Sequence, residues 1–339
     1  MEKQSPPEVN PCASVASDRA GSGGPSLRRI RVQERSRNLA TILRVSFRIA
    51  AAQYPVTALE SFEAYAAKLN TWFEEAVLGG AKLIVFPEYA SLELTAFMEP
   101  AGQQDIARQL VELQALLPAV LELHASMARK HGVYALAGSY PVLEGARYLN
   151  RAHFFGPDGR MAHQDKIVMT RFEREEWGIS GGAELRAFDT EFGRVGVSIC
   201  YDVEFPLIVR ALCDSGADLL LVPSCTQFES GYQRVRVGAR ARALENQCYA
   251  VQSPLIGQAP WTYALEQATG AAGVFAPIES RFSDDGVIAE GVTDAPGWVY
   301  ADLDLEALRE SRRDGETLNS RDWNESATIG GVKVSLEKF

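Results

Sequence analysis

The chain has 339 residues, of which 46% are hydrophobic and 23% are charged, and its 34 Lys and Arg against 44 Asp and Glu give a formal net charge of −10. These ordinary proportions exclude a wholly disordered or fibrous chain, and the acidic balance argues against nucleic acid as a partner, because phosphate binding needs a basic surface. Five cysteines without a CxxC pair predict a cytoplasmic protein without disulfides or a zinc site. No apolar run approaches the roughly 20 residues that a membrane span needs, so we expect no membrane partner.

The first part of the chain differs in composition from the rest. Residues 1–50 hold nine Lys or Arg and four Asp or Glu, and the stretch up to about Pro25 is rich in Ser, Pro and Gly. We expect residues 1–44 to form a disordered basic tail. No apolar segment follows Arg28 and Arg29, which argues against an export signal. The expected organisation continues with a main domain at 45–312 and a C-terminal extension at 313–339.

Strand and helix patterns alternate from residue 45 onward. Strands are predicted at 47–54, 82–88, 133–141, 150–155, 160–166, 194–200, 218–224, 249–255, 270–277, 286–291 and 298–304. Helices are predicted at 58–78, at 103–130 with an interruption near Pro118, and at 206–215, 232–247 and 305–312. No linker divides this region and no repeat of fixed period occurs in it. The pattern favours one α/β domain with a mixed sheet.

Several common motifs are missing from the sequence. Neither GxGxxG nor GxxxxGK[ST] nor HExxH occurs, so dinucleotide, P-loop and metalloprotease interpretations have no support. The segment GVSIC places Cys200 where the serine-nucleophile motif GxSxG needs Gly.

Three of the predicted strands end with an ionisable residue. VFPE ends at Glu88, HQDK at Lys166 and GVSIC at Cys200. Ligands of α/β proteins lie outside the carboxyl ends of the strands, so these side chains are expected to meet in one pocket. Each also has a simpler interpretation: Cys200 as a small buried hydrophobic residue, Glu88 as a turn or cap residue, and Lys166 as a surface charge.

Together the three residue types suit acyl transfer without a metal or a cofactor. A free thiol has a pKa of about 8.5, so a carboxylate within hydrogen-bond distance is needed to take its proton and later return it to a leaving amine. A neighbouring ammonium favours the thiolate and stabilises the oxyanion. The backbone N–H of Tyr201 is a second candidate oxyanion donor, and losing one such donor typically costs about 3–4 kcal/mol of barrier.

The segments FPEYA, DKIVMTRFE and GVSICYDVEFP, in this order, resemble the nitrilase or carbon–nitrogen hydrolase superfamily. AQYP looks like its first strand, RARALENQCYAV like its helix-to-strand segment, and GAAGVFAP like a late family segment with Ala272 in place of Ser. The likeness covers about residues 47–312. It implies a four-layer α-β-β-α sandwich with mixed sheets, no cofactor, and assembly into homodimers or larger homo-oligomers.

The resemblance also assigns roles. It carries over Glu88 as the base, Lys166 as the electrophilic stabiliser and Cys200 as the nucleophile. Family members often have a second glutamate shortly after the lysine. Glu173 is the favoured candidate here, and Glu176 stays open.

The residues after the nucleophile bear on the substrate. True nitrilases usually have Cys-Trp-Glu, whereas Cys200-Tyr201-Asp202 resembles the amidase, carbamoylase and ω-amidase branches. We therefore expect hydrolysis of a small amide to a carboxylate and ammonia or an amine through a cysteine thioester. Nitrile hydrolysis, N-carbamoyl (ureido) hydrolysis and a non-catalytic binding protein on the same fold are the alternatives, and Cys225 is the alternative thiol.

Overall fold

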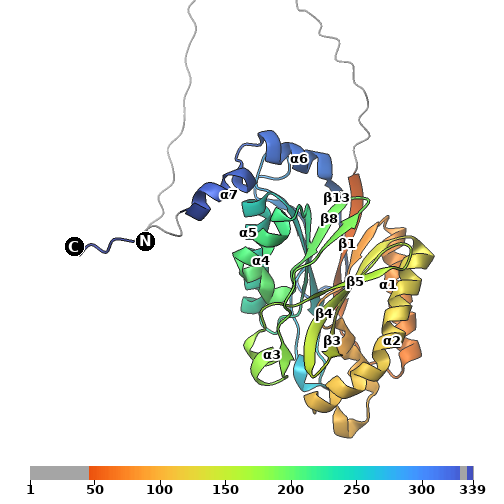
Figure 1. Cartoon of the computed structure of the whole chain (residues 1–339). Helices are drawn as coiled ribbons and strands as arrows, with labels where there is room; N and C mark the ends of the chain where they lie inside the picture. Colours follow the sequence, from red (N-terminus) through yellow and green to blue (C-terminus); the bar gives the residue numbers. More distant parts are fainter. Residues whose placement is uncertain (1–45, 329–333, 339) are drawn as a thin grey trace, which may run out of the picture. The chain divides into compact units, whose positions relative to one another are not determined.

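The computed structural model describes residues 46–328 and 334–338 (Figure 1). The expected disordered tail at 1–44 therefore lies outside the described residues. Within them, the chain forms thirteen strands and seven α-helices.

The strands form two sheets. The first sheet contains β1 (Ser46–Pro55), β2 (Leu83–Val85), β3 (Tyr134–Glu144), β4 (Arg147–Phe155), β5 (Met161–Asp165), β6 (Ile179–Ser180) and β13 (Gly297–Asp304). The second contains β7 (Ala187–Thr190), β8 (Gly193–Val197), β9 (Leu219–Ser224), β10 (Tyr249–Ile256), β11 (Gly273–Phe275) and β12 (Val287–Glu290). Parallel and antiparallel pairs occur in both, and among residues 46–328 the sheets join only where the ends of β1 and β10 pair.

The central strand β1 is buried on both of its faces. Ile49 and Ala51 belong to one hydrophobic core, and the alternating residues Ala50 and Ala52 belong to another. Successive side chains of a strand point to opposite faces, so an almost entirely apolar run suits a sheet that is covered on both sides.

Helices cover the outer face of each sheet. α1 (Phe62–Leu78) and α2 (Ile106–His131) lie on the first sheet, and α4 (Pro206–Asp214) and α5 (Glu229–Asn246) lie on the second (Figure 1). The layers thus follow the order α-β-β-α, and the fold expected from the sequence is confirmed.

The expected interruption of the second helix near Pro118 is wrong, because α2 continues through this residue. Asp105 caps its first turn, and Gly132 ends it in the left-handed conformation. Pro118 is exposed, while Leu113 and Val120 pack against the sheet on either side of it. Packing along the buried face therefore outweighs the one backbone hydrogen bond that proline removes.

By length and composition alone, α2 also passes as a candidate membrane span. Core helices of soluble proteins pass the same test, and the buried side of α2 is in contact with the first sheet. The finding is weak evidence for a membrane segment.

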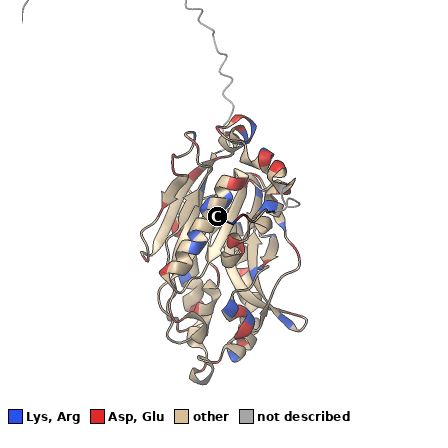
Figure 2. Cartoon of the chain, turned by 90° about the vertical axis from the view of Figure 1, so that its left-hand side faces the viewer, with Lys and Arg blue, Asp and Glu red and all other residues tan. Residues whose placement is uncertain are grey.

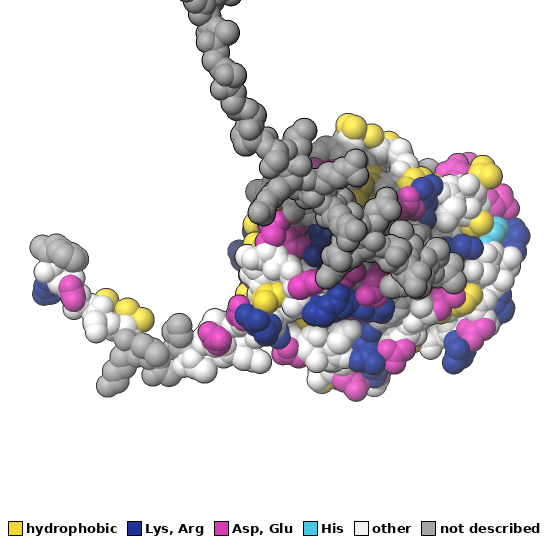
Figure 3. Space-filling view, turned by 90° about the horizontal axis from the view of Figure 1, so that it is seen from above, with side chains coloured by type: hydrophobic (Ala, Val, Ile, Leu, Met, Phe, Trp, Pro, Cys, Tyr) yellow, Lys and Arg dark blue, Asp and Glu magenta, His cyan; other side chains and the backbone are white. Residues whose placement is uncertain are grey.

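The remaining elements were not expected from the sequence. They are α3 (Arg171–Glu175), β6, β7 and α7 (Asn319–Ala327), together with the 3-10 helices η1 (Ala90–Phe97), η2 (Pro100–Gly102), η3 (Cys200–Glu204) and η4 (Tyr263–Leu265). The last predicted helix is present as α6 (Leu305–Asp314). Basic and acidic residues alternate along the ribbon in Figure 2, and their side chains are interspersed on the described surface that Figure 3 shows, so no large patch of one sign is visible in that view.

Candidate active site

Glu88 lies just beyond the end of β2, in a backbone segment that is held in place on both sides. The next residue, Tyr89, has a left-handed backbone with a φ of 56°, and its N–H donates a 3.1 Å hydrogen bond to the hydroxyl of Ser139 on β3. Gly138, with a φ of +75°, lies against the carbonyl oxygen of Pro87, with which any side chain at this position would collide. A glycine is therefore required where β3 passes the Glu88 segment.

The side chain of Lys166 is buried between two glutamates. Its Nζ lies 2.8 Å from Glu88 Oε1 and 2.6 Å from Glu173 Oε2. Asn150 of β4 donates 2.9 Å hydrogen bonds to the Oε1 atoms of the same two glutamates. These four side chains are all at least nine-tenths buried, so they form one closed polar cluster inside the protein.

Of the two candidates for the second glutamate, the structure brings Glu173 to the lysine. Glu176 instead accepts a 2.7 Å hydrogen bond from the hydroxyl of Tyr263. Glu173 is fixed by a capping box at the start of α3, where its carboxylate accepts hydrogen bonds from the backbone N–H and the hydroxyl of Thr170. The sequence signal for this choice is Thr-x-x-Glu, the pattern of a capping box.

The cluster perturbs the ionisation of its members. Burial raises the pKa of Glu88 above its ordinary value, although Lys166 opposes this. Burial also acts to raise the pKa of Glu173, but Lys166 outweighs it and holds this pKa below the ordinary value. Burial acts to lower the pKa of Lys166, but the two carboxylates hold it well above its ordinary value. Lys166 and Glu173 therefore stay ionised, and Glu88 is the member suited to exchange a proton.

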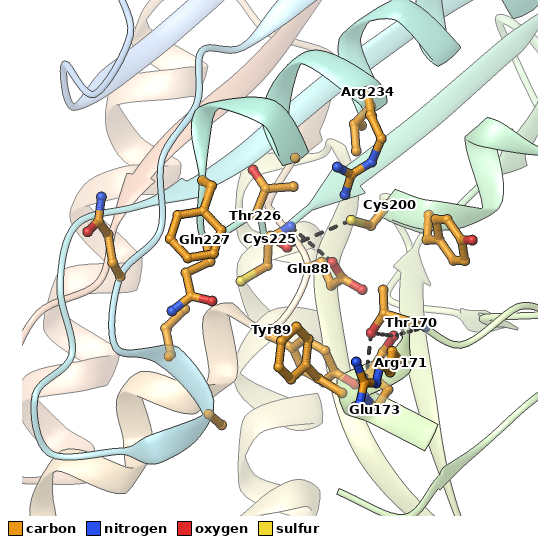
Figure 4. A pocket seen from close by; sticks show the side chains of 18 of the residues that line it. Glu88, Tyr89, Thr170, Arg171, Glu173, Cys200, Cys225, Thr226, Gln227 and Arg234 are labelled. Carbon is orange, nitrogen blue, oxygen red and sulfur yellow. Dashed lines mark hydrogen bonds between the residues drawn. The ribbon is translucent and has the colours of Figure 1, made fainter. Parts of the chain in front are cut away.

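Cys200 lies beside this cluster, at the first residue of η3. Its backbone is left-handed, with a φ of 49°, a conformation that costs a non-glycine residue about 1–3 kcal/mol and that clusters at active sites. Its Sγ lies 3.8 Å from the carbonyl oxygen of Cys225, whose N–H donates a 2.9 Å hydrogen bond to Glu88 Oε2 (Figure 4). The structure thus brings together the three ionisable residues that the sequence placed at strand ends.

The thiol of Cys200 keeps its proton in the resting protein. Burial raises its pKa well above the ordinary value, and the charge of Glu88 adds to this. Lys166 lowers the pKa, as expected from the sequence, but is outweighed. Thiolate formation therefore depends on transfer of the proton to Glu88, with which the thiol shares a hydrogen bond.

Two polar residues of the site were not identified from the sequence. Asn150 carries no local signal, because it is one polar residue at the start of a predicted strand. Asp202 was noted only as a marker of the family branch. Its buried carboxylate accepts hydrogen bonds from the N–H groups of Ile167 and Val168, and burial raises its pKa to about 7.

A pocket of about 570 Å³ opens over Cys200. Tyr201 lines it, and the backbone N–H of Tyr201 has no acceptor among the described residues, which leaves it available as an oxyanion donor. Cys225, the alternative thiol, also lines the pocket, and burial raises its pKa well above the ordinary value.

No group of three His, Cys, Asp or Glu residues able to hold a metal is found in the described part of the chain.

Sequence comparison yields one matching family model and several relatives. The family model, described as carbon-nitrogen hydrolase, matches residues 48–313. The probable hydrolase YhcX of Bacillus subtilis (strain 168) is 34% identical over 275 residues, which are 81% of this chain and 53% of that protein. This chain therefore spans about half the length of YhcX. Omega-amidase NIT2 of Danio rerio is 30% identical over 277 residues, 79% of this chain and 91% of the relative.

Comparison with solved structures finds the same fold. One match is a mutant of the amidase from Nesterenkonia sp. AN1 with the acetamide moiety of fluoroacetamide bound covalently at its active site cysteine. Its TM-score is 0.65 at 20% sequence identity, and the match covers 84% of this chain and 97% of that chain. At this identity the likeness shows the fold alone.

Proposed function

This chain belongs to the carbon–nitrogen hydrolase family, and from this premise we propose that it hydrolyses an amide to a carboxylate and ammonia or an amine, with Cys200 as the nucleophile. The observation that carries the proposal is the buried cluster in which Lys166 joins Glu88 to Glu173 beside a thiol. The amidase names of several relatives support an amide over a nitrile or an N-carbamoyl compound.

The first half of the proposed reaction forms a thioester. Glu88 accepts the thiol proton while Sγ of Cys200 bonds to the amide carbon, and the amide oxygen becomes an oxyanion. The ammonium of Lys166 and the backbone N–H of Tyr201 stabilise this oxyanion. The carbon–nitrogen bond then breaks, and Glu88 returns the proton to the leaving nitrogen.

The second half hydrolyses the thioester. Glu88 takes a proton from a water molecule as its oxygen bonds to the acyl carbon. The carbon–sulfur bond breaks, the proton returns to the sulfur, and the product leaves as the carboxylic acid, which loses its remaining proton to water and becomes the carboxylate. The same carboxylate thus serves as base and acid in both halves. Its raised pKa suits this exchange better than that of an ordinary surface glutamate.

Ammonia release from a panel of primary amides, nitriles and N-carbamoyl compounds tests the proposal. We expect turnover of amides, and a loss of at least about 10³-fold in Cys200→Ala, because covalent catalysis depends on this atom. Cys213→Ala is the control, since Cys213 lies on α4 outside the pocket. Turnover that survives in Cys200→Ala and disappears in Cys225→Ala would transfer the nucleophile role to Cys225. Binding of amides without turnover would favour the non-catalytic alternative.

The other expectations stay predictions. They are the cytoplasmic location, the assembly into homo-oligomers, the lack of a cofactor, and the lack of nucleic acid or membrane partners.

A further inference from the structure

Aromatic side chains are exposed around the mouth of the pocket. Phe172, Phe228 and Tyr263 are 51%, 61% and 56% exposed. All three line the pocket. In the part of the chain that the structure describes, they are the only aromatic members among the exposed large hydrophobic side chains. We call these three residues the aromatic rim. Contiguous apolar groups exposed at a cleft mark binding sites more often than isolated ones do.

The aromatic rim is assembled from three separate segments. Phe172 belongs to α3, Phe228 precedes the first turn of α5, and Tyr263 begins η4. The hydroxyl of Tyr263 donates its hydrogen bond to Glu176, which ties the η4 segment to the end of α3. An apolar stripe of one amphipathic helix therefore does not explain the exposure of these rings.

The pocket is also larger than the proposed reaction requires. Its volume of about 570 Å³ falls in the range of roughly 300–1,000 Å³ in which pockets enclose a drug-sized ligand. Inside the aromatic rim, the wall continues with Trp177 and Tyr89, whose rings pack edge to face at 5.6 Å, and with Leu265. A butyramide-sized substrate at Cys200 would leave the outer pocket and the aromatic rim without contacts.

The charges around the pocket do not favour an acidic substrate. Arg171 lies 2.8 Å from Glu175, and Arg234 lies 3.3 Å from Glu204. Each arginine at the mouth is thus paired with a carboxylate. Deeper in, Lys166 faces two glutamates. A substrate carboxylate would have to compete with these groups, whereas a neutral apolar group would bury ring surface at about 25 cal/mol per Å².

Building on the proposed function, we infer that the substrate is a neutral, extended amide with an aromatic or similarly bulky apolar group at the end far from the amide. The amide group would lie against Cys200, and the distal group would contact the aromatic rim. Aromatic side chains suit this role because they offer a large contact area with little conformational entropy to lose.

Three primary amides with the same amide end test this inference. Butyramide is the short reference, 4-phenylbutyramide adds a distal ring, and succinamic acid carries a carboxylate instead. We expect kcat/KM for 4-phenylbutyramide to exceed that for each of the other two by at least tenfold. In Phe228→Ala and Phe172→Ala, the ratio of kcat/KM for 4-phenylbutyramide to that for butyramide should fall, and Phe228→Leu should restore part of it.

Leu78→Ala is the matched control, because Leu78 is a 90% exposed apolar side chain at the end of α1, outside the pocket. Its substrate ratio should equal that of the parent protein. Equal turnover of all three amides, or a preference for succinamic acid, overturns the inference and leaves the proposed function standing. Absence of turnover with every amide overturns both.

Discussion

The carboxylate of Asp202 accepts a 2.8 Å hydrogen bond from the backbone N–H of Val168. This contact joins η3, which carries the thiol, to the segment that directly follows Lys166. The N–H of Ile167 donates to the same carboxylate. The nucleophile and the ammonium, which follow strands of different sheets, are thus held together by a third side chain that need not touch a substrate.

We predict that Asp202→Ala lowers kcat by about 10- to 100-fold, because a displacement of about 1 Å between reacting groups has an effect of this size. Unfolding should also require about 1–3 kcal/mol less, since two partly buried N–H groups lose their acceptor. Asp202→Asn keeps one oxygen for these donors and should lose less than tenfold in kcat. Initial rates and urea unfolding measure both effects. A larger loss in the Asn variant than in the Ala variant would contradict a positioning role.

The site shows which residues a sequence reveals and which it does not. Glu88, Lys166 and Cys200 could be predicted because each follows a recognisable strand, and the carboxyl ends of neighbouring strands lie at one edge of a sheet. Asn150 could not, because its role depends on which face of β4 meets the cluster. The alternation of residues along a strand does not by itself distinguish its two faces.

Glu173 lies between these cases. The sequence contains Thr170 three residues before it, which is a signal for a helix start, and a helix that starts there fixes Glu173 over Lys166. The sequence favoured Glu173 but left Glu176 open, because both lie in a segment crowded with charge. The net pKa shift of Cys200 was equally hidden, because burial, its largest cause, appears only once the fold is known.

We predict that Glu173→Gln lowers kcat by roughly 10- to 100-fold through displacement of the ammonium of Lys166. Glu176→Gln should have a smaller effect on kcat, because Glu176 contacts Tyr263 and not the lysine. Butyramide is the substrate for this comparison, since it does not reach the aromatic rim. Equal losses in the two variants would contradict the assignment of Glu173 as the second glutamate.

The activity should depend on pH through Glu88, which must be ionised to accept the thiol proton. Burial raises its pKa above the ordinary 4.5, so kcat/KM should fall as the pH falls through this raised value, and the acid limb should lie above pH 4.5. Asp202, with a pKa of about 7, titrates in a neighbouring range. The profile of Asp202→Asn therefore serves as the control. A limb that disappears in this variant would belong to Asp202 and not to Glu88.

Replacement of Glu88 should change the reactivity of the thiol and the turnover in opposite directions. The charge of Glu88 raises the pKa of Cys200, whereas Lys166 lowers it. Glu88→Gln therefore lowers this pKa and enlarges the thiolate fraction, while it removes the group that carries protons in both halves of the reaction. We expect alkylation of Cys200 by iodoacetamide at neutral pH to become several-fold faster, and ammonia release to fall by about 10²- to 10⁴-fold.

Cys213 provides the internal reference for this measurement. Its hydrogen bond with Cys248 and the nearby Arg312 and Arg210 lower its pKa, so in the parent protein it should be alkylated before Cys200. The rate at Cys213 should be the same in Glu88→Gln, because Cys213 lies outside the pocket. Peptide mapping by mass spectrometry separates the two sites. If alkylation of Cys200 slows in parallel with turnover, Glu88 acts by creating a thiolate in the resting enzyme, and the proton transfer proposed here does not occur.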